Sequence, residues 1–247
     1  MDRWIVGNWK MNGSREQAAA FVAEFLAGYR PAKGLRVGLC PPFPYISWLA
    51  EKLGGSQVLV GAQNAHPKPS GAFTGEVAAP MLADCGAALC LVGHSERRQF
   101  FHETDALIRE KLAALWQTSV TPILCVGESL AERESGRQQA VVQTQLDGAL
   151  KGASIPPGRL VVAYEPVWAI GTGKTATPQQ AQEMHAFIRK WLQANAPGHE
   201  IPLQYGGSVT PENAGSLLSQ PDINGALVGG ASLKAASFLA ILQHAQP

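Results

Sequence analysis

The stretch Leu160-Val161-Val162-Ala163-Tyr164-Glu165 is a run of five apolar residues that ends on a carboxylate. An apolar run without polar alternation is typical of a strand buried on both faces, as in a parallel sheet covered by helices. Most other apolar runs in the chain share this character, and together they predict eight strands. The remaining seven cover 4–7, 35–40, 58–61, 88–93, 122–127, 201–205 and 225–229.

Segments with helix signals lie between these runs. Ser14-Arg15-Glu16-Gln17 has the spacing of a capping box and precedes an apolar period that extends to Leu26. Thr177-Pro178 and Thr210-Pro211 each place a hydroxyl at the N-cap and a proline at the first helical position. We expect further helices over 44–53, 105–116, 130–150 and 232–243, whereas the segment after the third strand is less clearly helical.

The alternation of strands and helices predicts an α/β protein. We expect residues 1–247 to form a single (β/α)8 barrel, with eight parallel strands ringed by helices. The chain has no composition break and no Ser/Pro-rich linker that would separate two domains. A doubly wound open sheet is the alternative. It would be expected to carry G-x-G-x-x-G after the first strand, and Gly7-Asn8-Trp9-Lys10 does not begin that motif.

The composition describes a compact globular chain without a strong electric field. Of the 247 residues, 46% are apolar and 16% are charged, which excludes a disordered chain. The 20 Lys and Arg residues nearly balance the 19 Asp and Glu residues, so we expect neither nucleic acid nor a membrane as a partner. An anionic ligand would have to be bound locally.

Cysteine usage and the N-terminus predict a cytoplasmic protein. Cys40, Cys85, Cys90 and Cys125 form no C-x-x-C pair, and the N-terminal residues contain no apolar signal segment. No run approaches the roughly 18 apolar residues that a membrane helix needs. We interpret the four cysteines as buried packing residues in a reducing compartment.

Polar or glycine residues follow most of the predicted strands. The active site of such a barrel forms at the C-terminal ends of the strands, so these residues are the candidates for catalysis and binding. They are Asn8 and Lys10 after the first strand, Gln63 and Asn64 after the third, His94, Ser95 and Glu96 after the fourth, Glu128 after the fifth, Glu165 after the sixth, Gly206, Gly207 and Ser208 after the seventh, and Gly229 and Gly230 after the eighth.

A histidine and a carboxylate at one barrel mouth suit proton transfer. Of the six histidines, His94 alone directly follows a predicted buried strand, and Glu165 faces the same mouth. A structural histidine and a solvated acid are the alternative interpretations. Lys10 fits a solvated side chain, a Schiff-base nucleophile or a fixed charge near an anion. The glycines at 206–207 and 229–230 predict a phosphate site of backbone N–H groups, unless they serve tight turns alone.

The segment after Glu165 has the composition of a lid. Gly171-Thr172-Gly173-Lys174-Thr175 resembles part of a nucleotide-binding loop, but that motif requires glycine at position 168, where the chain has tryptophan. Small residues in the middle, with proline or branched residues at the ends, favour a loop that closes on hinges. The predicted lid comprises Pro166, Val167, Trp168, Ala169, Ile170, Gly171, Thr172, Gly173, Lys174, Thr175 and Ala176.

Six strings of residues resemble the triosephosphate isomerase family, and they span almost the whole chain in the order of that family. They are 7–12 (GNWKMN), 71–76 (GAFTGE), 92–98 (VGHSERR), 163–175 (AYEPVWAIGTGKT), 205–209 (YGGSV) and 227–233 (LVGGASL). The resemblance implies interconversion of dihydroxyacetone phosphate and D-glyceraldehyde 3-phosphate through an enediol or enediolate, in glycolysis and gluconeogenesis. It also implies that the reaction uses no cofactor and no metal.

The resemblance implies roles for individual residues. Glu165 would be the base, His94 the neutral electrophile and Lys10 the charge that stabilises anionic oxygen. Asn8 would help to position substrate, and Glu96 would be the partner of Lys10. The residues expected to bind the phosphorylated triose are Asn8, Trp9, Lys10, Gly171, Ser208, Gly229 and Gly230, the last four chiefly through main-chain N–H groups.

The resemblance further implies a homodimer whose interface loop follows the third strand. The matching residues are Gln63, Asn64, Phe73, Thr74, Gly75 and Glu76, and Thr74 would reach the neighbouring active site. The stretch 66–70 (HPKPS) is less familiar for the family, and Asn224 and Ala226 also depart from its commoner residues. The alternatives in other functional classes are a Schiff-base aldolase that uses Lys10 and a catalytically silent barrel that binds phosphate.

Overall fold

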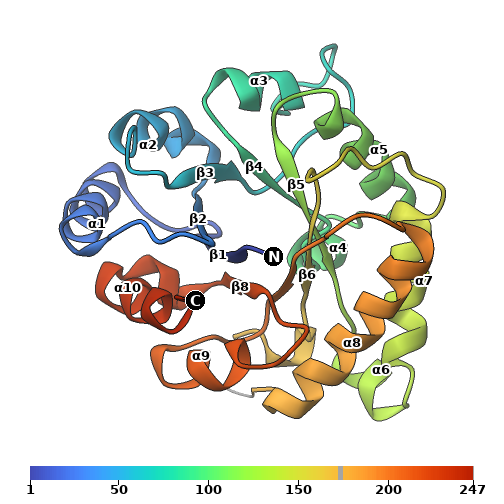
Figure 1. Cartoon of the computed structure of the whole chain (residues 1–247). Coiled ribbons are helices and arrows are strands. Elements are labelled where there is room, and N and C mark those ends of the chain that lie inside the picture. Colours follow the sequence, from blue (N-terminus) through green and yellow to red (C-terminus); the bar gives the residue numbers. More distant parts are fainter. Residues whose placement is uncertain (172–174, 247) are drawn as a thin grey trace.

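The computed structural model describes residues 1–171 and 175–246, and it contains a closed barrel of parallel strands (Figure 1). Each strand pairs with the next along the chain and β8 pairs with β1, which confirms the predicted fold class. The strands are β1 (Arg3–Asn8), β2 (Leu35–Cys40), β3 (Leu59–Ala62), β4 (Leu89–Val92), β5 (Thr121–Val126), β6 (Val161–Tyr164), β7 (Leu203–Tyr205) and β8 (Gly225–Val228). Every predicted apolar run overlaps one of them.

The barrel closes at a glycine. Trp4 of β1 pairs with Gly225 of β8, and a Cβ atom at position 225 would stand 1.9 Å from the carbonyl oxygen of Trp4. Gly225 also has a φ of +156°, which side-chain-bearing residues rarely adopt. β1 and β8 can therefore approach each other because this position has no side chain.

Helices ring the barrel on the outside (Figure 1). The α-helices are α1 (Arg15–Gly28), α2 (Ile46–Lys52), α3 (Ala79–Asp84), α4 (Ser95–Phe100), α5 (Asp105–Trp116), α6 (Leu130–Glu134), α7 (Gln138–Leu150), α8 (Pro178–Asn195), α9 (Pro211–Leu218) and α10 (Ala235–His244). Within residues 1–171 and 175–246, three 3₁₀ turns accompany them: η1 (Phe43–Tyr45), η2 (Val167–Ala169) and η3 (Gly230–Leu233). None of the helices in the described part of the chain combines the length and apolar character that crossing a membrane requires.

Cap hydrogen bonds confirm the predicted helix starts. The Oγ of Ser14 accepts the N–H of Gln17 at 3.1 Å, which caps α1. At α8, the Thr177 side chain accepts the N–H of Gln180 at 3.1 Å, and the Gln180 side chain accepts the N–H of Thr177 at 2.9 Å. Thr210 forms the equivalent capping box at α9. These bonds satisfy N–H groups that have no partner within the first helical turn.

Other helix predictions are wrong in part. The expected helix over 130–150 is two helices, because Gly136 adopts a φ of 71° and the N–H of Arg137 bonds to the carbonyl of Glu132 at 2.9 Å, which ends α6. The expected helices over 44–53 and 232–243 each start with a 3₁₀ turn, η1 and η3. Helix α4 was not expected, since its six residues carry no apolar period.

Two apolar layers explain the continuous apolar runs. Alternate strand residues, such as Ile123 and Cys125 of β5, belong to a small cluster that fills the barrel. Their neighbours Leu124 and Val126 join the larger cluster between the strands and the helices. One cysteine prediction is wrong: Cys85 is exposed, because it lies at the C-terminal end of α3 on the outside of the barrel.

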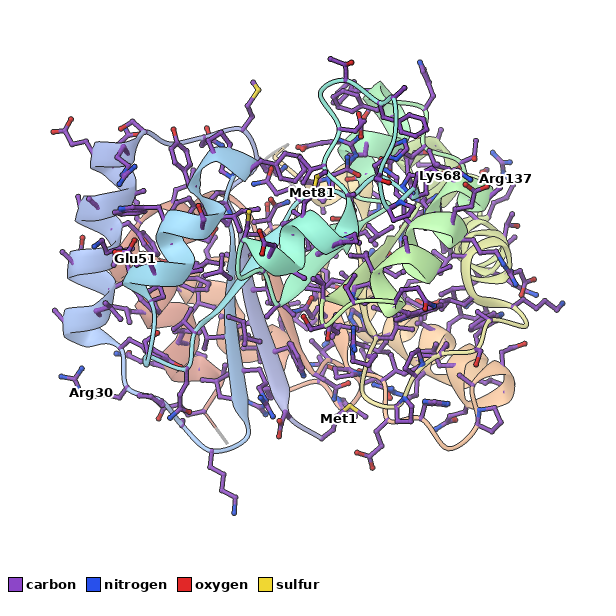
Figure 2. All side chains as sticks on the ribbon, turned by 90° about the horizontal axis from the view of Figure 1, so that it is seen from above. Met1, Arg30, Glu51, Lys68, Met81 and Arg137 are labelled. Carbon is purple, nitrogen blue, oxygen red and sulfur yellow. The ribbon has the colours of Figure 1, made fainter. Side chains whose placement is uncertain are left out.

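The two ends of the barrel carry different parts of the chain. Met1 and Arg30 lie at the end where the strands begin, and Lys68, in the loop after β3, lies toward the opposite end (Figure 2). The C-terminal strand ends, and with them the predicted site residues, face this second end.

Candidate active site

Glu165 follows β6 directly and its carboxylate is buried at the barrel mouth. Its backbone N–H donates to the carbonyl of Val126 at 2.7 Å, which continues the pairing of β6 with β5 by one residue. Its Oε2 accepts the N–H of Ser95 at 2.8 Å, and its Oε1 lies 3.1 Å from Nε2 of His94. A Cβ atom at Gly206 would stand 2.9 Å from the Glu165 Cγ, so the glycine that follows β7 makes room for the acid.

His94 forms the N-cap of α4, and this position defines its tautomer. Its Nδ1 accepts the backbone N–H of Glu96 at 3.2 Å, so this nitrogen carries no proton. The ring proton of a neutral imidazole is then on Nε2, which points to the Glu165 carboxylate. In this tautomer the ring presents an N–H donor to the carboxylate.

Lys10 enters the site from a strained backbone. Its φ of 52° lies in the left-handed region, and its N–H donates to Oδ1 of Asn8 at 3.0 Å. The side-chain amide of Gln63 donates to the carbonyls of Lys10, at 2.8 Å, and Cys40, at 2.9 Å. The Nζ of Lys10 lies 2.5 Å from Oε1 of Glu96, which confirms the expected contact between these two residues. Gln63, directly after β3, thus helps to hold the conformation that aims the ammonium group.

These side chains surround a cavity of about 310 Å³ at the C-terminal ends of the strands. A cavity of this size with a few convergent polar groups suits a small polar ligand. Nine of the residues predicted for catalysis or binding line it: Asn8, Trp9, Lys10, His94, Glu165, Gly171, Ser208, Gly229 and Gly230. Glu96 reaches the site through its contact with Lys10.

The turn after β8 forms another part of the cavity wall. Gly229 and Gly230 open the η3 turn, and Ser232 folds back so that its N–H and Oγ both donate to the carbonyl of Gly229, at 2.8 and 2.7 Å. The indole of Trp9 donates to the carbonyl of Ser232 at 3.1 Å. The turn is thereby fixed, and the backbone at Gly230 is open, since a Cβ atom there would meet no atom within 4 Å.

The predicted lid leaves Glu165 as a short 3₁₀ turn. The N–H of Val167 donates to the carbonyl of Glu128 at 3.0 Å, and the indole of Trp168 donates to Oε1 of Glu128 at 2.9 Å. Further along, the carbonyl of Ala169 accepts the N–H of Ser208 at 3.0 Å. Residues 172–174 of the predicted lid (Thr172, Gly173 and Lys174) lie outside the described residues.

Glu128 is a residue to which sequence reasoning assigned no role. Its carboxylate is fully buried after β5, and its Oε1 accepts the hydroxyl of Tyr164 at 3.0 Å in addition to the Trp168 indole. Arg133 donates to the same oxygen at 3.3 Å and lies over the Trp168 ring at 5.5 Å. The position of Glu128 after a predicted buried strand marked it as a candidate, but its role could not be predicted because Tyr164 and Trp168 are distant in sequence.

Known proteins share this chain's sequence over nearly its full length. The family model described as triosephosphate isomerase matches residues 3–245. The chain belongs to the triosephosphate isomerase family. The triosephosphate isomerase of Carboxydothermus hydrogenoformans is 50% identical over 245 residues, covering 97% of each chain. That of Thiobacillus denitrificans is 52% identical over 247 residues, covering 98% of this chain and 97% of the relative. That of Xanthomonas euvesicatoria is 49% identical over 245 residues, with coverage of 98% and 97%.

In this member of the triosephosphate isomerase family, the residues expected at a subunit interface fall into two groups. Gln63 contacts backbone carbonyls of its own chain, and Oδ1 of the buried Asn64 accepts a hydrogen bond from Lys111 at 2.7 Å. Residues 73–76 (Phe73, Thr74, Gly75 and Glu76) are exposed instead. The ring of His66 lies 4.2 Å from the ring of Phe73, so the unfamiliar stretch 66–70 supports the exposed aromatic residue.

The described part of the triosephosphate isomerase family site offers no cluster of metal ligands. Across residues 1–171 and 175–246, no three His, Cys, Asp or Glu side chains are grouped to hold a metal ion. The cavity is instead lined by a carboxylate, an imidazole and an ammonium group, from Glu165, His94 and Lys10.

Proposed function

We propose that this protein interconverts dihydroxyacetone phosphate and D-glyceraldehyde 3-phosphate, by proton transfer between adjacent carbons, in glycolysis and gluconeogenesis. The observation that carries the proposal is the pair formed by the buried Glu165 carboxylate and the neutral N–H donor of His94, 3.1 Å apart at the cavity. A base and a donor at this separation can act on a carbon and on the oxygen attached to the neighbouring carbon. Family membership supports the same substrate.

Glu165 acts as the base in this mechanism. Its carboxylate removes a proton from the carbon beside the carbonyl; the electron pair of that C–H bond forms the carbon–carbon double bond of the enediolate, and the carbonyl π pair moves onto the oxygen. His94 gives its Nε2 proton to that oxygen and takes up the hydroxyl proton of the neighbouring carbon, and the protonated Glu165 delivers its proton to the former carbonyl carbon. Because the carboxylate is 2% exposed, few water molecules compete with the carbon for it. The Ser95 N–H holds the acid to one side until substrate arrives.

His94 acts as the electrophile. Its Nε2–H donates to the carbonyl oxygen, and this hydrogen bond strengthens as negative charge develops there. Asn8 helps to position the same part of the substrate, and the ammonium group of Lys10 stabilises the charge. The Glu96 carboxylate forms an ion pair with the Lys10 ammonium group at 2.5 Å. A Schiff-base aldolase would need Lys10 as a free amine, so the ion pair favours the isomerase, and borohydride should trap no adduct on Lys10.

The phosphate group is bound by the lid and by the turns after β7 and β8. We assign it to backbone N–H groups at Gly171, Gly229 and Gly230, with Trp9 supporting the last turn, and to Ser208. The Ser208 N–H donates to the carbonyl of Ala169, so it binds phosphate once that contact opens. Closure of the lid over 166–176 would exclude water from the enediolate and reduce loss of phosphate. The mechanism requires no cofactor and no metal.

The test is isomerisation of glyceraldehyde 3-phosphate by wild type and Glu165→Asp, without added metal or nucleotide. The shorter acid keeps its charge but moves by about one methylene, and a misplacement of that order costs about a hundredfold in kcat. Equal rates for the two proteins would place the base elsewhere. An inactive wild type would favour the catalytically silent barrel.

We also propose a cytoplasmic homodimer in which the exposed loop around Phe73 packs into a second copy of the chain and Thr74 approaches the partner's site. The exposed aromatic ring, braced by His66, supports this assembly. No nucleic acid or membrane is involved. Phe73→Asp should convert a dimer to a monomer in analytical ultracentrifugation, whereas Glu51→Gln on the exposed face of α2 should not.

A further inference from the structure

Gln145 contacts the chain segment behind the catalytic base, and neither the proposed mechanism nor the predicted site includes it. Its Oε1 accepts the N–H of Gly127 at 2.8 Å, and its Nε2 donates to the carbonyl of the same residue at 2.9 Å. One side-chain amide from α7 therefore satisfies both polar groups of a residue that has just left β5. We infer that Gln145 is a positioning residue that acts through Gly127 on Glu165; this inference rests on the proposed function.

Gly127 lies between the two residues that hold the base and the lid. The carbonyl of Val126 accepts the N–H of Glu165 at 2.7 Å, and the carbonyl of Glu128 accepts the N–H of Val167 at 3.0 Å. A movement of Gly127 displaces both acceptors, and with them the backbone on either side of Pro166. The backbone position of the base thus depends on three consecutive residues, and Gln145 fixes the middle one.

The backbones of Gly127 and Glu165 are in close contact. A Cβ atom on Gly127 would stand 1.7 Å from the carbonyl oxygen of Glu165, so the two backbones touch. Gln145 itself is held by its neighbours on α7, since Val142 and Leu146 are fully buried. Gln145 and Glu165 also line the same cavity of about 380 Å³, behind the base. The displacement of one group is therefore transmitted to the other through direct contacts.

The first experiment removes both hydrogen bonds at constant size. Gln145→Met should lower kcat at least tenfold, because sub-ångström misplacement of a base is costly, and an ångström costs about a hundredfold. KM and the inhibition constant of inorganic phosphate should change less than kcat, since the glycines at 229 and 230 follow β8, whereas Gln145 acts on the backbone after β5 and β6. Gln143→Met, on the exposed face of the same helix, should match wild type.

The second experiment uses protonation of a carboxylate to restore the hydrogen bond that is donated to the Gly127 carbonyl. In Gln145→Glu the ionised carboxylate can accept the Gly127 N–H but cannot donate to its carbonyl, whereas the protonated acid can do both. The ratio of variant to wild-type kcat should therefore rise as the pH falls from 8 to 6. If Gln145→Met does not fold, the pH dependence of Gln145→Glu alone tests the positioning role.

Two results would overturn the positioning role. One is a Gln145→Met kcat within about twofold of wild type. The other is a parallel weakening of phosphate inhibition, together with a pH-independent ratio for Gln145→Glu, which would indicate a general loss of packing. An inactive wild type overturns the proposed function itself, and the wild-type assay distinguishes that result from the other two.

Discussion

The two sides of the cavity are built by different means. On the side of β4 to β6, side chains are fixed by hydrogen bonds, as for Glu165 between Ser95 and His94. On the side of β7 and β8, glycine turns present backbone, as at Gly229 and Gly230. Proton transfer needs individual atoms at defined places, whereas a phosphate dianion is well bound by several backbone N–H groups. The difference predicts that mutations on the two sides separate kcat from phosphate affinity.

The largest expected effect is on the base side. His94→Gln removes the neutral N–H donor at Nε2 and places an amide at a different height and angle. Loss of one such donor lowers kcat by about 10²- to 10³-fold. Inhibition by inorganic phosphate should hardly change, because the glycine turns are untouched. A matching loss of phosphate affinity would show that the two sides are not independent.

A second effect connects both sides through one buried residue. His185 of α8 is fully buried between Tyr164, which precedes Glu165, and Tyr205, which precedes the β7 glycines. Burial lowers the pKa of His185 to about 4, against the opposing effect of the Ala181 carbonyl that its Nδ1 contacts at 2.7 Å. The neutral ring therefore stabilises the fold fully above pH 6.5, and this contribution is lost as the pH falls toward 4.

The size of this acid sensitivity is on the order of 3 kcal/mol, since each pKa unit corresponds to about 1.4 kcal/mol. Urea unfolding at pH 7, 5.5 and 4.5 measures it. In His185→Phe, which keeps an aromatic ring, the free energy of unfolding should fall less over this range than in wild type. Equal slopes for the two proteins would contradict the assignment.

The features that depend on local sequence patterns could be predicted from the sequence. The buried strands, the caps at Ser14 and Thr177, and the placement of His94 and Glu165 at strand ends follow from apolar runs and short-range hydrogen bonding. Helix α4 was not predicted, because its six residues are mostly polar and it continues directly from the turn at the end of β4.

The contacts that tune the site are long-range and were harder to predict. Gln63 holds the backbone of Lys10 across 53 residues of sequence, and Glu128 meets Trp168 across 40. Both partners are polar and neither pair has a local period or motif. The contact between Lys10 and Glu96 was expected from family resemblance, because spacing within the chain does not indicate it. Side-chain pairing across a barrel mouth depends on the closed fold itself.

Substitution of two glycines, one beside the base and one in the phosphate turn, should give smaller effects on different kinetic constants. In Gly206→Ala the new Cβ atom would stand 2.9 Å from Cγ of Glu165, which must shift, so kcat should fall about tenfold or more. In Gly230→Ala the new methyl meets no protein atom within 4 Å. It should raise KM and weaken phosphate inhibition while leaving the fold unchanged. Steady-state kinetics of the pair would contradict the comparison if both variants changed the same constant.

The smallest expected effect concerns the residue directly below the base. Cys125 is fully buried in the barrel interior, and burial, followed by the nearby Glu165 carboxylate, raises the pKa of its thiol well above the usual value. It is therefore a neutral packing group rather than a nucleophile. Cys125→Ala should lower the free energy of unfolding by about 1 kcal/mol, as expected for removal of one buried heavy atom, and change kcat less than threefold. The exposed Cys85→Ala serves as control in the same urea titrations. Unchanged stability with lost turnover would instead assign Cys125 to the support of Glu165, and would extend the fixed side of the cavity one layer down into the barrel.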